Sequence, residues 1–200
     1  ELFDNARGIG LSDAKSIERL MTVLLLSGLG MTIAGGSYPA SQSEHMVAHA
    51  YEMLIGYRSA DNKPASLHGE EIGVTALASA HMQEKLMRTT PRLRPDDFDS
   101  KTMIENYGSK ISVQARKSFD VKQELIQQSG LRHREPIKHW DNIAERINEI
   151  RIPAKRMEAI LAAADAPVAS QTLKWQEPAY NVAASTARYL RERFTFLDLE

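Results

Sequence analysis

Apolar residues recur at three- and four-residue spacing along most of the chain, which is the period of an amphipathic α-helix. Capping residues and prolines fall where such helices begin or end. The sequence has no run that alternates apolar and polar positions at strand period, no internal repeat and no low-complexity segment. It therefore predicts an all-α fold, with helices over 13–26, 41–56, 68–90, 96–106, 113–128, 137–150, 154–164 and 181–193.

The first predicted helix is apolar on all sides over residues 23–26, which indicates a helix buried on more than one side. Its longest apolar stretch, 21–26, is interrupted by Thr22 and followed by Ser27 and Gly28. That stretch is far shorter than the roughly 20 apolar residues that span a bilayer. We therefore expect no membrane span.

Composition narrows the class of protein. The chain has 200 residues, of which 42% are hydrophobic and 26% charged, with a net charge of −1. These values are typical of one soluble globular domain, or two small ones, and argue against a partner held by charge such as nucleic acid. Because there is no cysteine, any metal needs His, Asp or Glu ligands, and the composition fits a cytoplasmic protein. The first residues resemble no signal peptide, and the chain can be a piece of something longer.

Three histidines are candidates for chemistry. His45 and His49 are four residues apart and so share a helix face, and His68 opens the following helix. Neutral imidazoles are good ligands for zinc, nickel and iron. The alternative is a polar patch or satisfied core histidines, and the pair lacks the glutamate of the zinc-protease signature. Glu44 is better explained by a capping box with Ser41.

Two glycine-rich segments allow two interpretations each. Gly28 and Gly30 resemble the start of a dinucleotide fingerprint, but they follow a helix and the third glycine is missing. The segment 35–37 precedes a helix start and offers backbone N–H groups to a phosphate, or simply makes a tight connection. Trp140 and Trp175 are expected to be packing anchors.

Several motifs together resemble the sn-glycerol-1-phosphate dehydrogenases. These are SGLGM at 27–31, GSYPAS at 36–41, SEHMVAH at 43–49 and LHGE at 67–70. The ending over 187–199 also looks like the end of that family. The superfamily further contains glycerol dehydrogenase, iron-containing alcohol dehydrogenases and 3-dehydroquinate synthase.

The resemblance implies a two-domain enzyme. Residues 1–200 look like its helical, bundle-like C-terminal domain, which binds metal and substrate. The N-terminal α/β domain that binds NAD(P) would then be absent from this chain, which would supply no cofactor-binding residue of its own. An isolated chain of this kind is expected to be inactive.

The resemblance also assigns residues. His45 and His68 match the metal-binding histidines, the metal being zinc, nickel or iron, while the third ligand, an Asp, has no match here. His49 would line the pocket as a catalytic residue and help relay the hydroxyl proton. We expect Gly36, Ser37 and Gln42 to bind the substrate.

The implied reaction is hydride transfer between dihydroxyacetone phosphate and sn-glycerol 1-phosphate, with the metal polarising the C2 oxygen. Two positions depart from the family. Tyr38 stands where an Arg is expected, and Gln42 stands where the family has Gly. The missing Arg would remove a bidentate contact with the substrate phosphate.

Two other functions remain open at this point. One is a 3-dehydroquinate synthase-like lyase, which uses the same scaffold and metal with NAD as a transient oxidant. The other is a non-enzymatic helical interaction domain with structural histidines. In the enzymatic interpretations the partner is a small phosphorylated polyol, without nucleic acid, and a homo-oligomer is compatible with the sequence.

Overall fold

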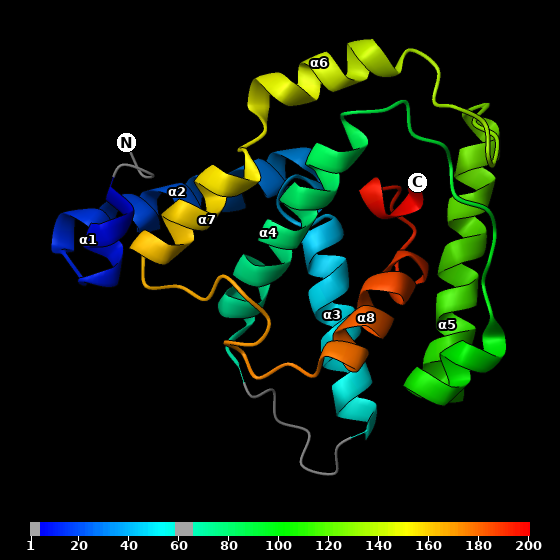
Figure 1. Cartoon of the computed structure of the whole chain (residues 1–200), viewed down its shortest axis with the longest axis horizontal. Helices are drawn as coiled ribbons and strands as arrows, with labels where there is room; N and C mark the ends of the chain where they lie inside the picture. Colours follow the sequence, from blue (N-terminus) through cyan, green and yellow to red (C-terminus); the bar gives the residue numbers. More distant parts are fainter. Residues whose placement is uncertain (1–4, 59–65) are drawn as a thin grey trace.

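The computed structural model describes residues 5–58 and 66–200. Its elements are helices joined by loops, with isolated β-bridges but no strand in these ranges, so the all-α prediction is confirmed (Figure 1). The α-helices are α1 (Ala6–Gly10), α2 (Ala14–Ala34), α3 (Ser43–Arg58), α4 (His68–Leu86), α5 (Ser100–Gln128), α6 (Trp140–Ile150), α7 (Ala154–Ala163) and α8 (Glu177–Thr186). The short 3-10 helices are η2 (Tyr38–Ala40), η3 (Ala187–Tyr189) and η4 (Phe196–Asp198).

Helix α3 lies at the centre of the main core. It packs against α4, α5 and α8, which surround it in Figure 1. One stripe of α3, formed by Met46, Ala50 and Leu54, is buried in that core at four-residue spacing. A neighbouring stripe of the same helix carries half-buried titratable side chains, so the packing of α3 also fixes the direction of its polar face.

The start of α3 differs from the predicted capping box. The helix begins at Ser43, because Ser41 is still extended with φ −149°. The backbone N–H of Gln42 donates to Glu44 Oε1 at 2.9 Å. Glu44 therefore satisfies the helix start as expected, but Gln42 takes the place predicted for Ser41.

Helix α5 joins the two helices predicted over 96–106 and 113–128. The join is a kink at Gly108, which has φ +81° and ψ 164°. A Cβ atom at this position would lie 2.7 Å from the ring of Tyr57. Only glycine adopts this φ and leaves room for the Tyr57 ring without strain, so Gly108 allows α5 to pack closely against α3.

Both tryptophans are packing anchors, as expected. Trp175 stacks on Tyr51 of α3 with ring centroids 4.0 Å apart, and it belongs to the main core. Trp140 is buried in a second cluster with Leu93 and Leu199, which ties α6 to the end of the chain. Helix α6 begins at Trp140 and not at 137, because His139 before it has a left-handed φ of +56°.

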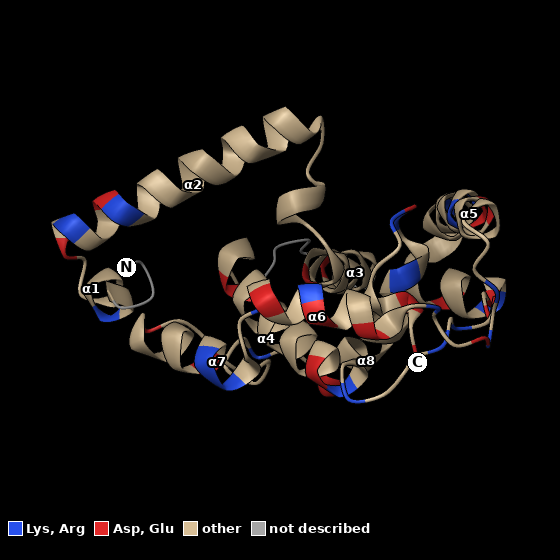
Figure 2. Cartoon of the chain, turned by 90° about the horizontal axis from the view of Figure 1, so that it is seen from above, with Lys and Arg blue, Asp and Glu red and all other residues tan. Residues whose placement is uncertain are grey.

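Helix α2 contradicts the prediction of a buried first helix. Its apolar side chains are exposed, with Leu25 at 70% and Ile33 at 80%, and Figure 2 shows the helix standing apart from the helices of the main core. Its contacts are with α1 and η2 at its two ends. Although α2 is apolar on all sides, its apolar side chains are therefore not buried within this chain.

The same helix also changes the expectation about membrane spans. Helix α2 has 21 residues and a mean hydropathy of 1.5, which by length and composition alone suffices to cross a membrane. The continuous helix from Ala14 to Ala34 is much longer than the apolar stretch 21–26 on which that expectation was based. One such helix near an N-terminus is weak evidence of a span, because core helices and signal sequences meet the same criteria.

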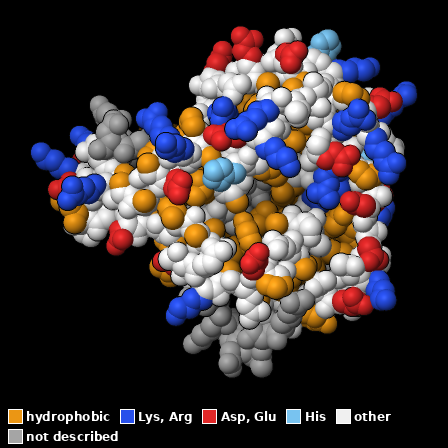
Figure 3. All heavy atoms as spheres, in the orientation of Figure 1, with side chains coloured by type: hydrophobic (Ala, Val, Ile, Leu, Met, Phe, Trp, Pro, Cys, Tyr) orange, Lys and Arg blue, Asp and Glu red, His pale blue; other side chains and the backbone are white. Residues whose placement is uncertain are grey.

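Charged side chains of both signs are interleaved on the face shown in Figure 3. Acidic and basic residues alternate there over α5, α6 and α7. On α5, Arg116 pairs with Asp120 of the same helix and with Asp96 of the segment before it. This face is a solvated surface with mixed charge.

Candidate active site

Three histidines predicted from the sequence come together in the fold. His45 and His49 project from the polar stripe of α3, and His68 is the first residue of α4, which packs beside α3. The ring centroids lie 6.1 Å apart for His45 and His49, 5.7 Å for His45 and His68, and 5.0 Å for His49 and His68. Packing of α3 on α4 therefore gathers all three imidazoles into one cluster.

A carboxylate holds each of these imidazoles by its Nδ1 atom. His45 Nδ1 lies 2.9 Å from Glu44 Oε1. Glu52 uses both oxygens, with Oε2 2.7 Å from His49 Nδ1 and Oε1 2.9 Å from His68 Nδ1. An ionised carboxylate only accepts hydrogen bonds, so each Nδ1 donates its hydrogen and each Nε2 keeps a free electron pair. The cluster thus offers three imidazole nitrogens to a cation or a proton.

Glu52 and Glu71 have opposite electrostatic environments. Burial raises the pKa of Glu52, but hydrogen bonds from His49, Glu71 and His68 outweigh it and leave that pKa below its ordinary value. Burial raises the pKa of Glu71 to about 7, with a smaller lowering by Ser66 and a further raising by Glu52. Glu52 is therefore the ionised member of the pair and Glu71 the one that holds a proton near neutrality.

Glu71 itself is 2% exposed. The hydroxyl of Ser66 donates to its Oε1 at 2.6 Å. Among the described residues no donor faces its Oε2, which lies 4.0 Å from His68 Nδ1. A buried oxygen without a donor fits a carboxyl group that carries a proton and shares it with Glu52.

The donor set fits a divalent metal. One ligand atom each from His49, Glu52 and His68 lies within 4.8 Å of the other two. Imidazole nitrogen and carboxylate oxygen are ligands that zinc, nickel and iron accept, and carboxylates behind the imidazoles are the usual support of such ligands. The sequence assignment paired His45 with His68. Among the described residues the geometric group contains His68 with His49 and Glu52, and it does not include His45.

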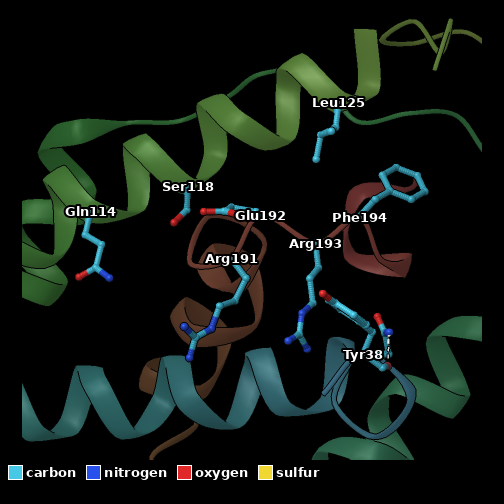
Figure 4. A pocket seen from close by; sticks show the side chains of 9 residues that line it. Tyr38, Gln114, Ser118, Leu125, Arg191, Glu192, Arg193 and Phe194 are labelled. Carbon is cyan, nitrogen blue, oxygen red and sulfur yellow. Dashed lines mark hydrogen bonds between the residues drawn. The ribbon is translucent and has the colours of Figure 1, made fainter. Parts of the chain in front are cut away.

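A cavity of about 250 Å³ adjoins the histidine cluster. It is lined by side chains from three parts of the chain, namely Ser37, Ser41, His45, Met46, His49, Arg191 and Arg193. A second cavity of about 640 Å³ lies between α5 and the segment 191–194, as Figure 4 shows. Arg191 and Arg193 line both cavities, so the two spaces meet at these arginines.

The structure distributes the predicted substrate residues unevenly. Ser37 lines the cavity beside the histidines. Gln42 lines the larger cavity instead, and its side-chain amide donates to the Tyr38 carbonyl at 2.5 Å. Gly36 lines neither cavity but leaves room for the Tyr38 ring, because a Cβ there would meet that ring at 2.6 Å. Their role in substrate binding stays a prediction.

Sequence reasoning missed Glu52 and the two arginines. A signal for Glu52 was present, because it follows His49 by three residues and so shares its helix face. Arg191 and Arg193 gave no local signal, since they stand more than 140 residues after His49. Only the fold brings the end of the chain to the start of α3.

Comparison with known proteins gave matches to curated sequences only. No family model and no solved structure matches the chain. Proteins named glycerol-1-phosphate dehydrogenase (NAD(P)+) are similar to part of it. The protein of Thermococcus kodakarensis is 36% identical over 93 residues, which are 44% of this chain and 24% of that protein. The protein of Aeropyrum pernix is 40% identical over 83 residues, 42% of this chain and 22% of that protein. The matched region thus spans about a quarter of the length of these relatives.

Proposed function

We propose that this chain, which resembles the glycerol-1-phosphate dehydrogenase family over about two fifths of its length, is the metal- and substrate-binding part of an NAD(P)-linked oxidoreductase. The reaction would interconvert dihydroxyacetone phosphate and sn-glycerol 1-phosphate. The proposal assigns dinucleotide binding to a separate α/β domain, in keeping with the small share of the relatives that the chain matches.

The observation that carries this proposal is the convergence of His45, His49 and His68. Three imidazoles have centroids within 6.1 Å of one another, and each has a carboxylate at its Nδ1, so three accepting Nε2 atoms belong to one cluster that a cation would stabilise. The arrangement is therefore better suited to binding a cation than to packing alone. This favours the enzymatic interpretation over a helical interaction domain.

In this proposal His45 and His68 hold a divalent metal, with Glu52 supporting His68. Zinc, nickel or iron bound there would polarise a carbon–oxygen bond and lower the pKa of a hydroxyl group. Glu44 accepts from Nδ1 of His45 and Glu52 accepts from Nδ1 of His68. The Nε2 atom of each ring is therefore left free to bind the metal. The carboxylates thus fix tautomer and orientation before a substrate arrives.

His49 is the proposed proton carrier. Its Nδ1 hydrogen is held by Glu52 at 2.7 Å, so its Nε2 is the atom that can take a proton from a substrate hydroxyl. The ionised Glu52 stabilises the resulting imidazolium by its negative charge. His49 also lines the cavity of about 250 Å³, where a hydroxyl group could approach it.

Metal titration tests this proposal directly. We expect Zn²⁺ titrated calorimetrically into the 200-residue chain to bind at one site and to raise the melting temperature. His45→Ala and His68→Ala should each weaken binding by about tenfold or more, since each removes a ligand. His81→Ala is the matched control, because His81 is an exposed histidine of α4 outside the cluster. Equal zinc affinity in all four proteins, or no binding, would contradict the proposal.

The division of roles between domains has its own test. We expect the 200-residue chain to bind zinc without oxidising NADH in the presence of dihydroxyacetone phosphate, because the proposal places dinucleotide binding outside it. NADH oxidation by this chain alone would overturn that division while leaving the metal site intact. A lyase of the dehydroquinate synthase kind would release phosphate from its own substrate without net NADH consumption.

A further inference from the structure

Two arginines near the end of the chain enter the cavity that the histidines line. We propose that Arg191 and Arg193 form the binding site for the phosphoryl group of a phosphomonoester substrate. The inference rests on the proposed function, because it assigns the charged end of the same substrate. It is carried by the placement of two guanidinium groups beside His45 and His49, at the meeting point of the two cavities.

Arg193 is held in place before any ligand binds. Its guanidinium donates to the Ser41 carbonyl and, at 2.8 Å, to Ser37 Oγ. The guanidinium carbon lies 5.1 Å from the centre of the Tyr38 ring, within range of a cation–π contact. A guanidinium has five N–H donors, so two contacts leave donors for an oxyanion. Ordering this side chain in advance lowers the entropic cost of binding.

Arg191 is exposed and carries an uncompensated charge. Within residues 5–58 and 66–200 it has no described hydrogen bond or ion pair. Figure 4 shows its guanidinium directed toward α3, as is that of Arg193, whereas Glu192 between them is directed toward Ser118 on α5. The nearest acid in sequence therefore faces away, and the two positive charges face the histidine cavity together.

The chemistry of this cavity fits a dianion better than a neutral polyol. Two guanidinium groups match the charge of a phosphomonoester, and their planar forks match its oxygen geometry. Glu44 and Glu52 already accept from the histidines, so their charges are partly engaged. Arg193 also stacks on Tyr38, the residue that stands where the family resemblance predicts an Arg. Arg193 thus places a cation beside Tyr38, close to the position where the family motif has an Arg.

The test is binding of phosphate compounds without metal. Inorganic phosphate, sn-glycerol 1-phosphate and glycerol are titrated calorimetrically into the 200-residue chain in the presence of EDTA. We expect both phosphate compounds to bind and glycerol not to bind. Arg191→Gln should weaken phosphate binding by about tenfold or more, the usual effect of losing a charged hydrogen bond. Added NaCl should weaken it further in the unmodified chain.

Two more variants complete the experiment. Arg193→Gln should also lose affinity, but it removes contacts to Ser37 and Ser41, so its melting temperature is measured alongside. Arg191→Gln removes no described contact and keeps the test independent of folding. Arg146→Gln is the matched control, because Arg146 is an exposed arginine on α6 that lines neither of the two cavities. Its affinity for phosphate should equal that of the unmodified chain.

The outcomes separate this inference from the proposed function. Unchanged phosphate affinity in Arg191→Gln, equal losses in Arg191→Gln and Arg146→Gln, or no phosphate binding would overturn the inference even if zinc binds through the histidines. Arginine-dependent phosphate binding without any zinc binding would instead support the anion site and overturn the metal site.

Discussion

At the scale of single residues, Glu52 organises the candidate site. One side chain accepts from His49 through one oxygen and from His68 through the other, and it interacts with Glu71, whose pKa burial raises to about 7. Because α3 carries His49 and α4 carries His68, this carboxylate also links the two helices. We expect Glu52 to orient the imidazoles, and zinc binding can test this role without an activity assay.

We expect Glu52→Gln to weaken zinc binding by about 10- to 100-fold, the usual cost of losing a carboxylate behind metal-binding histidines. An amide has only one accepting oxygen, so it cannot hold both Nδ1 hydrogens. Calorimetric titration of Zn²⁺ measures the change. Glu124→Gln, an exposed position on α5, is the control and should bind as the unmodified chain does. Equal affinity of the two variants would remove Glu52 from the site.

A second residue-scale prediction concerns stability in acid. Burial raises the pKa of Asp97, but the hydrogen bond from Tyr189 and the charges of Arg188 and Arg94 outweigh it and lower that pKa below 3.8. A carboxyl with a lowered folded pKa stabilises the fold above its unfolded pKa and loses that contribution as pH falls through the folded value. We therefore expect the melting temperature to fall below about pH 5.

The matching variant isolates this carboxyl. Asp97→Asn should melt at a lower temperature at pH 7, because Arg188 loses one of its two carboxylate partners, the one at 2.9 Å. Its melting temperature should then fall less between pH 7 and pH 3 than that of the unmodified chain does. Melting curves at several pH values check both points. Parallel curves for the two proteins would show that Asp97 contributes nothing to the acid sensitivity.

Where a local pattern existed, the fold brings the predicted residues together, and their roles as metal ligands and proton carrier stay predictions. His45, His49 and His68 lie in recognisable spacing and context, and the fold does cluster them. Arg191 and Arg193 lie in the family-like ending 187–199, but they were missed as site residues because that motif does not show that Arg193 contacts residues 152 and 156 positions earlier. The cap of α3 was assigned to Ser41 from its three-residue spacing to Glu44, but Ser41 is extended, and Glu44 accepts from the backbone N–H of Gln42.

At the scale of elements, the kink in α5 decides how the helices fit. Gly108 lets two helical segments continue as one element while Tyr57 of α3 approaches its Cα. The sequence indicated two helices with a gap here, because glycine lowers helix propensity. The structure agrees in having two helical segments, but they meet at the non-helical residue Gly108 and are not separated by a gap.

We expect Gly108→Ala to lower the free energy of unfolding by about 1–3 kcal/mol, because φ +81° is strained for alanine and its Cβ would collide with Tyr57. Urea denaturation followed by circular dichroism measures the change. Gly28→Ala is the control, since Gly28 lies inside α2 with open space around it. That variant should be neutral or stabilising by up to about 1 kcal/mol. A neutral Gly108→Ala would mean that the kink is not required.

At the scale of the whole molecule, a buried charge cluster ties the end of the chain to α5. Lys122 and Arg188 are both 0% exposed, and both contact Asp198, at 3.0 and 3.3 Å. Burial lowers the pKa of Lys122, and Asp198 counteracts that effect. No pattern in the sequence indicates this network, because charged residues are ordinarily exposed. The cluster holds the segment that carries Arg191 and Arg193 against α5.

Asp198→Ala should therefore destabilise the chain by about 3–5 kcal/mol, because it leaves buried cations without their partner. Urea denaturation gives the free energy directly. Asp120→Ala, which removes an exposed carboxylate paired with Arg116, should cost about 1 kcal/mol or less. Similar losses in the two variants would show that the buried cluster is no more important than a surface pair.

The contacts of Arg193 with Ser41 and Ser37 join residues 152 and 156 positions apart. On the ribosome, the segment with the three histidines is made long before Arg193 is added. A nascent chain can therefore assemble its imidazole cluster early, but the arginine side of the pocket stays open until residue 193 has been added. A chain that stops before residue 191 would carry the histidines without Arg191 and Arg193 opposite them.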